Sequence, residues 1–439
     1  MDNMTYSGIN DCVALSMEPP GRPWWICLLF LFGAFGMGAF AWTYQIGHGL
    51  EWSGISHPIA WGVYITDFVF WIGIAHAGTL ISAILHLLRA PFRTAICRAS
   101  EAMTVFAVMT AGLFPLIHLG RMLHGFWLLP YPNQRELWVN FKSPLLWDLF
   151  AVSTYMFVSV AFFLLGLVPD LASVRDESRG LKRFLYGIPS LGFKGTNHQW
   201  LHYTRGYLLF AAIATPLVFS VHSIVSWDFA VASIPGWHST LFAPYFVAGA
   251  IFSGCAMVLT ILIPLRKAFE GFETIITVKD LEGVAKIIVF TSLIVGYSYA
   301  MEFFFAYYSG SPGERSLFRF RLFGEYGYFV WGMIFCNAVV PIALWFQSIR
   351  TSIPALFTIS ILINVGMWLE RFVIVVTPLA HDADPFVRGT YRFEWVEIWI
   401  TIGSFGCFFL CFFIFVKTVP SLAIAELKAA VPPPCRKKR

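Results

Sequence analysis

Ionisable side chains stand inside long apolar stretches of this sequence, close to one end of four of them. They are Asp67, His118, Arg121, His124, Asp148, His222 and Asp228. A charged side chain at the centre of a bilayer costs at least about 2.5 kcal/mol on insertion scales, so each of these residues needs a partner or a chemical task. Their similar depth predicts that acid, imidazole and guanidinium groups from four helices face one region.

The spacing within one stretch brings three of these groups together. His118, Arg121 and His124 follow one another at intervals of three residues, which predicts that they share one face of a helix. Asp148 comes one turn after Pro144, at the start of the next apolar stretch and therefore at the same end.

A histidine and a carboxylate from different helices suit the oxidation of a quinol, a reaction that removes two protons and two electrons. Neutral imidazole accepts a proton near neutral pH, and burial increases the proton affinity of a carboxylate. We therefore predict a quinol site in which His118 and Asp148 accept the protons. The alternative interpretation is structural, because a hydrogen-bonded pair such as Asp148 with Arg121 would hold two helices together.

Further ionisable residues in the apolar stretches are candidates for a proton path. They are His76, His222, Asp228, Glu302, Glu370 and Arg371. A relay through Glu302 and Glu370 and a purely structural set of ion pairs are equally compatible with the sequence. Because adjacent helical residues point about 100° apart, Glu370 and Arg371 are expected to pair with other helices rather than with each other.

The composition indicates that the apolar stretches cross a membrane. Of the 439 residues, 58% are hydrophobic and only 13% are charged, whereas about 25% of a soluble domain is charged. A hydrocarbon core requires roughly 20 apolar residues as helix. Ten stretches qualify: 24–45, 60–88, 101–127, 144–168, 205–228, 240–265, 284–309, 325–349, 352–378 and 394–417. Their continuous apolar character excludes a β-barrel, so the expected fold class is an all-α polytopic membrane protein.

The distribution of Lys and Arg predicts the orientation in the membrane. These residues are concentrated in the N-terminal segment, in alternate connections and in the C-terminal tail, which ends in Arg436, Lys437, Lys438 and Arg439. The positive-inside rule therefore puts both termini in the cytoplasm. The first stretch, 24–45, is too long for a signal-peptide core and is expected to be a retained helix.

A weak internal repeat aligns Gly73 with Gly254 and predicts two four-helix bundles, made by helices two to five and six to nine. In this alignment Asp67 corresponds to Ala248, so the two bundles do not share their polar residues equally. The expected divisions are an N-terminal segment (1–23), the first helix with its outer loop (24–59), a first bundle with the quinol site (60–230), a second bundle (231–380), and the last helix with the basic tail (381–439).

Eight cysteines are scattered without a CxxC pair or a Cys/His spacing typical of metal ligands. The sequence therefore predicts no haem, iron–sulfur cluster or other metal bound by this chain, and electrons would need a partner. Two alternatives from other classes remain open. A haem-carrying cytochrome b would use His118 and His222 as axial ligands. A proton or solute transporter would use the repeat, with polar residues at mid-membrane.

The longest motifs lie between Asp67 and Tyr155: DFVFWIGIAHAGTLISAIL, EAMTVFAV, GLFPLIHLGR, LPYPNQ and WVNFKSPLLWDLFAVSTY. They resemble the NrfD/polysulfide-reductase type of quinol-interacting membrane subunit, and within that type most closely the ActC subunit of alternative complex III. The resemblance implies ten helices, cytoplasmic termini in a bacterial inner membrane, and a quinol pocket near the periplasmic side of the first bundle. The pocket histidine and aspartate of the family correspond to His118 and Asp148, and Asp67 and Arg121 match surrounding positions as supporting residues.

The resemblance also implies a cofactor and partners. The cofactor is a quinol or quinone, either menaquinone or ubiquinone. The partners are a periplasmic iron–sulfur subunit, multihaem cytochrome c subunits and a second NrfD-like membrane subunit. The implied activity is quinol oxidation with proton release to the periplasm, and electrons passing through the iron–sulfur partner towards cytochrome c or an oxidase. Proton translocation coupled through the second bundle is an additional hypothesis.

Overall fold

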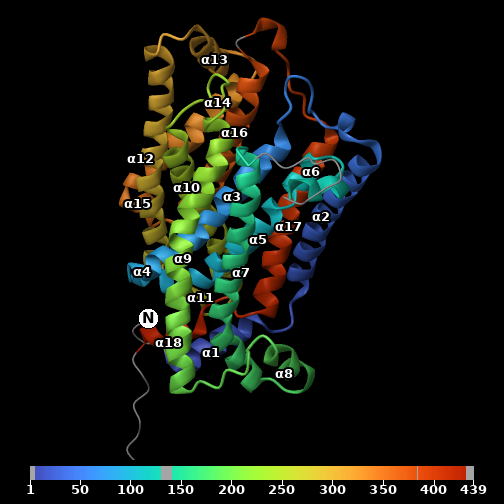
Figure 1. The fold of residues 1–439 in the computed structure, drawn as a ribbon. Helices are drawn as coiled ribbons and strands as arrows, with labels where there is room; N and C mark the ends of the chain where they lie inside the picture. Colours follow the sequence, from blue (N-terminus) through green and yellow to red (C-terminus); the bar gives the residue numbers. More distant parts are fainter. Residues whose placement is uncertain (1–4, 130–140, 383, 432–439) are drawn as a thin grey trace, which may run out of the picture.

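The computed structural model describes residues 5–129, 141–382 and 384–431, and helices make up almost all of this length (Figure 1). Within the described residues, ten helices are long and apolar enough to cross a membrane. They are Arg22–His48, Val63–Leu87, Cys97–His118, Pro144–Glu177, Asn197–Ala230, Phe242–Ala268, Val278–Tyr308, Gly327–Trp345, Ile353–Ala380 and Trp395–Thr418. The predicted all-α polytopic membrane fold is therefore confirmed.

Seven of these spans are single helices and three are composite. The single ones are α2 (Arg22–His48), α7 (Pro144–Glu177), α9 (Asn197–Ala230), α10 (Phe242–Ala268), α12 (Val278–Tyr308), α16 (Ile353–Ala380) and α17 (Trp395–Thr418). The composite ones are α3 (Val63–Thr79) with the π-helical η2 (Leu80–Ile84) and α4 (Leu85–Leu87), α5 (Cys97–Ala111) with α6 (Phe114–His118), and α14 (Gly327–Ile334) with the π-helical η5 (Phe335–Val339) and the 3₁₀ turns of η6 (Val340–Trp345).

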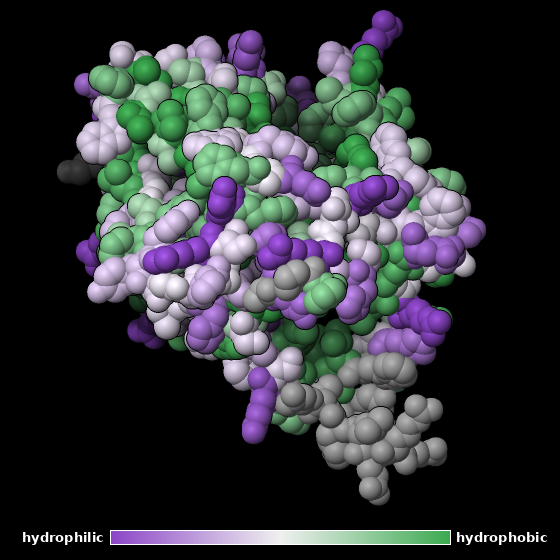
Figure 2. All heavy atoms as spheres, turned by 90° about the horizontal axis from the view of Figure 1, so that it is seen from above, coloured by the Kyte–Doolittle hydropathy of each residue, from purple (hydrophilic) through white to green (hydrophobic). Residues whose placement is uncertain are grey.

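Short helices collect at the two ends of the bundle. The short α-helices α1, α8 and α18 lie at one end and α13 at the other (Figure 1). We call the first the inner end and the second the outer end, following the predicted orientation. The short elements are α1 (Tyr6–Ser16), η1 (Leu50–Trp52), η3 (Pro91–Ala95), η4 (Met122–Leu128), α8 (Gly180–Gly187), α11 (Phe272–Ile275), α13 (Pro312–Phe323), α15 (Gln347–Arg350), η7 (Pro385–Val387) and α18 (Ile424–Ala430). Hydrophilic side chains gather across the middle of the face seen from above in Figure 2.

Local sequence signals explain where several spans begin. Thr196 caps α9 and forms a capping box with Gln199, and Thr277 does the same for α12 with Asp280. Proline occupies the first turn of α7, where its missing N–H costs no hydrogen bond. Helices α7 and α9 each have 34 residues, about 51 Å at 1.5 Å per residue, which is longer than the hydrocarbon core. They therefore extend beyond the predicted boundaries.

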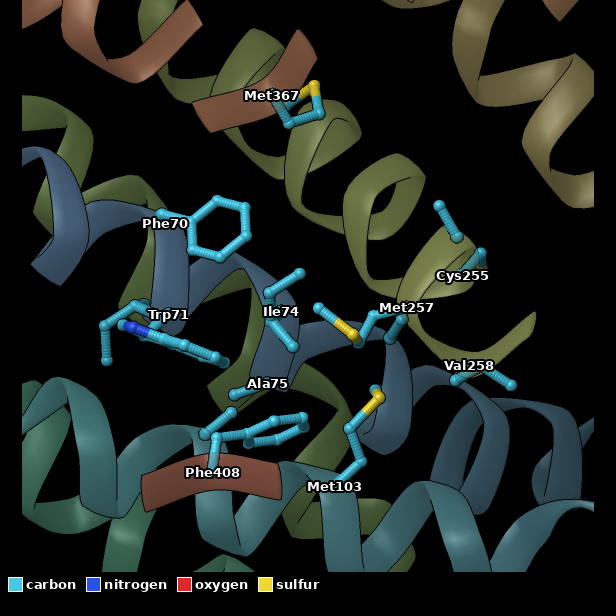
Figure 3. Close-up of a cluster of buried hydrophobic side chains, with 14 of the residues drawn as sticks. Phe70, Trp71, Ile74, Ala75, Met103, Cys255, Met257, Val258, Met367 and Phe408 are labelled. Atoms are coloured by element: carbon cyan, nitrogen blue, oxygen red, sulfur yellow. The ribbon is translucent and has the colours of Figure 1, made fainter. Parts of the chain in front are cut away.

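Helix α3 occupies the centre of the molecule. In the span Val63–Leu87, which begins with α3, 94% of the most apolar segment is buried inside the protein. In α2 the corresponding share is 11%. Figure 3 shows Trp71 and Ile74 of α3 among Met103 of α5, Met257 of α10 and Phe408 of α17. Helix α3 thus contacts both predicted bundles and the last span.

Glycines allow helices α3 and α10 to approach closely. A Cβ atom at Gly254 of α10 would lie 2.4 Å from the Cβ atom of Ala77 in α3, and a Cβ atom at Gly73 would come within 3.5 Å of Ser253. The two glycines that the repeat aligns therefore lie at the same helix crossing. The division into two bundles stays a prediction.

The first and last spans, α2 and α17, pack against each other. A Cβ atom at Gly38 of α2 would lie 2.6 Å from the Cα atom of Gly403 in α17. This backbone contact makes the two helices a flanking pair, in which α17 also contacts α3 and α5.

One predicted span was wrong in its extent. The third stretch was expected to be helical over 101–127, but the helix ends at His118, Gly120 adopts a left-handed φ of 68°, and Arg121 lies outside any helix before η4 begins. A left-handed glycine redirects the chain. The shared helical face expected for His118, Arg121 and His124 therefore does not exist. The predicted turn at 130–133, and Cys435 with the basic residues 436–439, lie outside the described residues.

Replacing Gly254 by Val tests the crossing of α3 and α10. The branched side chain would meet Ala77 and the backbone of Ile74, and we expect overpacking to cost about 1–3 kcal/mol. Thermal unfolding of the purified protein in detergent should then occur several degrees lower. Gly296→Val in α12 is the matched control, because a Cβ atom there has no neighbour within 4 Å. Equal unfolding temperatures for the two variants would contradict the packing argument.

Candidate functional site

Asp148 lies in the second turn of α7, at the outer end, and its side chain is buried. Its carboxyl group lies beside the carboxyl group of Asp228, which lies in the last turn of α9. A hydrogen bond between two carboxyl groups requires a proton between them, because two bare carboxylates repel each other in an apolar interior. Asp148 and Asp228 therefore form an acid pair that one shared proton would stabilise.

His118 is the last residue of α6 and presents an unused ring nitrogen. Its Nδ1 atom is buried and has no hydrogen-bond partner. The backbone beside it is held by Gln45 of α2, whose Nε2 atom donates to the carbonyl oxygen of Ile117 at 2.8 Å. Gln45 also accepts a hydrogen bond from the hydroxyl of Tyr64 in α3. His118 thus has a fixed backbone and a ring atom available to a ligand.

Arg121 is exposed and follows the break after α6, so it does not share a helix with His118. Among the described residues, no ion pair joins Arg121 to Asp148, and the neighbour of Asp148 is Asp228 instead. Five cavities among the described residues have linings that include neither His118 nor Asp148. Residues 130–140, which connect η4 to α7, lie outside the described part of the chain.

Asp67 connects three helices. One carboxylate oxygen accepts a hydrogen bond from Trp368 Nε1 of α16 at 2.7 Å, and the other accepts one from Thr401 Oγ1 of α17 at 2.7 Å. Both oxygens are engaged and the residue is fully buried. In this arrangement Asp67 joins α3 to α16 and α17, and its expected supporting role at the quinol site stays a prediction.

His76 and His222 form a buried pair deeper in the bundle, with ring centroids 4.4 Å apart. The two ring nitrogens of His76 lie 2.6 Å and 2.7 Å from the carbonyl oxygens of Ile72 and Val218. A neutral imidazole can donate to only one of these carbonyls, whereas an imidazolium donates to both. Neither ring nitrogen of His222 has a partner. In this pair, both ring nitrogens of His76 therefore face a carbonyl acceptor, whereas both ring nitrogens of His222 are available to bind a proton or a ligand.

The ring of His222 also bears on the alternative of a haem-carrying cytochrome b. It is fully buried and packs against Phe246 of α10 at 5.8 Å as well as against His76. These two rings occupy space that a haem bound to His222 would need. The pairing of His118 with His222 as axial ligands therefore does not fit this packing.

Glu370 and Arg371 of α16 form an ion pair with each other at 2.8 Å, so the expectation that they would pair only with other helices was wrong. Their long side chains bridge the angle between adjacent positions. Glu370 also accepts a hydrogen bond from Tyr299 of α12, and the guanidinium of Arg371 lies 4.5 Å from the ring centroid of Phe246. Phe246 therefore stands in contact with both Arg371 and His222.

Glu302 of α12 lies 3.9 Å from the guanidinium of Arg321 in α13. These two residues line a small cavity of about 10 Å³ together with Tyr245 and Tyr299. This volume is close to the minimum for one water molecule. The ion pair and its cavity are compatible with both the relay and the structural interpretation.

Sequence reasoning missed a polar cluster at the inner end. Arg98 of α5 pairs with Glu101 at 2.6 Å and with Asp170 of α7 at 2.8 Å, and Tyr207 of α9 donates to Glu101 at 2.7 Å. Asp170 also accepts from the backbone N–H of Ala425, next to α18. The signal in the sequence was an acidic residue beside the end of a predicted apolar stretch: Glu101 at the start of 101–127 and Asp170 just after 144–168. The stretches were drawn too short, because polar residues inside a longer helix were taken as its boundaries.

The C-terminal helix α18 is attached beside this cluster. Glu426 pairs with Arg93 of η3. Burial raises the pKa of Glu426, but the charge of Arg93 and the hydrogen bond from it lower the pKa by more. The resulting pKa lies below the usual value for a glutamate. Glu426 therefore stays ionised and holds α18 to the inner end of the first bundle.

No group of three or more His, Cys, Asp or Glu side chains among the described residues is arranged to hold a metal ion. The cysteines at positions 12, 27, 97, 255, 336, 407 and 411 are free thiols. The polar residues of this chain can accept, hold and pass protons, and they can bind a hydroxyl or carbonyl group of a ligand.

Comparison with known proteins identifies related membrane subunits. The family described as "Polysulphide reductase, NrfD" matches residues 52–380. A putative membrane subunit of a dimethyl sulfoxide reductase from Halobacterium salinarum is 27% identical over 389 residues, which cover 87% of this chain and 84% of the relative. A selenate reductase subunit from Mesobacillus selenatarsenatis is 21% identical, with 86% and 89% covered. An Hdr-like menaquinol oxidoreductase integral membrane subunit of Archaeoglobus fulgidus is 19% identical, with 88% and 91% covered.

The acid pair makes a prediction for infrared spectroscopy. Replacing Asp228 by Asn gives Asp148 an amide donor in place of the shared proton, so the C=O band of one protonated carboxyl group should disappear. Asp148→Asn should remove the same band. Asp176→Asn is the control, since Asp176 lies on the same helix with a side chain that is 61% exposed. Spectra of D228N and D148N identical to that of the unmodified protein would refute the shared proton.

Proposed function

Because the chain belongs to the NrfD polysulphide reductase family, we propose that it is the quinol-binding and quinol-oxidising membrane subunit of a respiratory electron-transfer complex. The quinol binds at the outer end of the first bundle, between His118 and Asp148. Arg121 and Asp67 are supporting residues of this site. The observation that carries the proposal is the unpartnered Nδ1 atom of His118, at the same end of the bundle as the acid pair of Asp148 and Asp228.

Each part of this site has a distinct task. The free Nδ1 atom of His118 accepts a proton from one quinol hydroxyl. The acid pair already holds one proton and has capacity for a second, so it accepts the other. Both groups lie at the outer end, and the protons therefore leave towards the periplasm. The names of the relatives support the direction, since one is a menaquinol oxidoreductase subunit and two belong to reductases, which consume electrons.

The electrons leave through partner subunits. In our proposal these are a periplasmic iron–sulfur subunit, multihaem cytochrome c subunits and a second NrfD-like membrane subunit, as in alternative complex III. The quinol is menaquinol or ubiquinol. The chain lies in a bacterial inner membrane with both termini in the cytoplasm.

Proton translocation is a second part of the proposal. Asp228 and His222 lie on α9, and His222 contacts His76, whose ring is 5.4 Å from the ring of Tyr155. The hydroxyl of Tyr155 contacts Thr79 at 2.7 Å. In the second bundle, the Glu370–Arg371 and Glu302–Arg321 pairs provide further ionisable positions. These residues are candidates for carrying protons between the inner end and the quinol site.

Replacing His118 by Asn or Asp148 by Asn should abolish quinol oxidation, because each change removes a proton acceptor. General acid–base groups of this kind contribute about 10²–10⁴-fold to rate, and the loss should fall in that range. The measurement is quinol-dependent reduction of an electron acceptor by the purified complex. His202→Asn and Asp176→Asn are the controls, because both residues are at the inner end and should leave turnover unchanged. Normal turnover in H118N and D148N complexes that retain all their subunits would remove the site assignment.

The proton stoichiometry separates the two parts of the proposal. The complex in sealed vesicles should release two protons per quinol on the outer side if only the quinol hydroxyls supply them. Coupled translocation should raise this ratio above two and deplete protons on the inner side. Glu370→Gln should then bring the ratio back to two while quinol oxidation continues. A ratio of two in the unmodified complex would exclude translocation and leave quinol oxidation intact.

A further inference from the structure

Helix α8 presents an apolar stripe that no other part of the described chain covers. Leu181, Phe184, Leu185 and Ile188 are spaced as one face of a helix, and they are 72%, 64%, 55% and 62% exposed. Leu191, just beyond the helix, is 79% exposed. A run of large apolar side chains of this extent on a surface marks an interaction site.

The position of α8 is set by contacts at and just beyond its C-terminal end. The hydroxyl of Tyr186 donates to the carbonyl oxygen of Thr418 at 2.9 Å, and Thr418 is the last residue of the α17 span. Arg175 of α7 donates to Ser190 Oγ at 3.0 Å and to the carbonyl oxygen of Phe193 at 2.7 Å. Helix α8 is therefore fixed at the depth where α17 leaves the membrane. Figure 1 shows it at the inner end, at the side of the bundle.

Basic side chains accompany the apolar stripe. Arg179, Lys182 and Arg183 lie within or next to α8, and Lys182 and Arg183 are exposed. A shallow cavity of about 460 Å³ opens beside the helix. It is lined by Arg175, Gly180, Arg183, Phe184, Gly187 and Ile188. Two guanidinium groups and two apolar side chains therefore border one cavity. The guanidinium of Arg175 is already paired with Asp176 at 2.9 Å, so the exposed Arg183 supplies the positive charge for a ligand.

We propose that α8 lies in the lipid interface at the inner end and that this cavity binds the headgroup of an anionic phospholipid. Guanidinium groups suit a phosphodiester because they donate several hydrogen bonds in a plane. The stripe enters the boundary between headgroups and acyl chains, as amphipathic interfacial helices do. The positive charge matches the anionic lipids of a cytoplasmic leaflet.

The observations favour a lipid over a protein partner. The stripe is level with the end of a membrane span, where apolar side chains already face acyl chains. Lysine is depleted in protein–protein interfaces, whereas the exposed Lys182 lies on α8 next to Leu181 of the stripe. This proposal depends on the membrane position of the chain and is independent of the quinol site.

Hydrogen–deuterium exchange of the full chain in nanodiscs tests the proposal. Exchange of the α8 amides should be slower in phosphatidylcholine nanodiscs that contain phosphatidylglycerol than in nanodiscs of phosphatidylcholine alone. In Arg183→Gln the slowing of exchange by phosphatidylglycerol should be roughly fivefold smaller, which is the factor for one basic side chain near an anionic surface. Lys267→Gln is the matched control, because Lys267 is exposed at the inner end of α10, away from the cavity.

Native mass spectrometry provides an independent readout. The unmodified protein and K267Q should each retain one more phosphatidylglycerol molecule than R183Q, whose thermal stability in detergent should be unchanged. Three results would overturn the proposal. These are equal α8 exchange in both kinds of nanodisc, equal protection by inorganic phosphate in detergent, and protection that appears only when a partner subunit is present.

Discussion

Inside a bilayer, a polar side chain finds hydrogen-bond partners only within the protein, and this constraint orders the whole molecule. Several buried charged residues meet it across helices. Asp67 uses both carboxylate oxygens on α16 and α17, and Arg98 pairs with two acids. The hydrogen bonds and ion pairs of such residues hold the helices together. The unused nitrogens of His118 and His222 depart from this pattern, and a buried polar atom without a partner is where a ligand or a proton has a place.

The central position of α3 explains how the polar groups are related. The helix is surrounded by α5, α10, α16 and α17, so its residues contact both halves of the chain. His76 of α3 contacts His222, while Phe246 of α10 stands between His222 and Arg371 of α16. The histidine pair of the first predicted bundle and the ion pair of the second therefore contact the same aromatic ring.

The sequence predicted the ten spans because long apolar runs mark them directly, and local caps refine several starts. It did not predict which side chains meet, since that depends on helix rotation and packing. The partner of Asp148 is Asp228, eighty positions away in sequence, and no spacing rule pairs two acids. The break after His118 depends on the conformation of Gly120. Glu370 and Arg371 pair because flexible side chains override the angle between their Cα–Cβ bonds.

The flanking pair of α2 and α17 lies outside residues 52–380, the region that matches the family. Yet Gln45 of α2 bonds to the backbone next to His118, and Thr401 of α17 bonds to Asp67. The two helices thus form a flanking module that supplies hydrogen bonds to the region that matches the family. Chimeric chains that exchange this module would change the polar surroundings of the core without altering a single core residue.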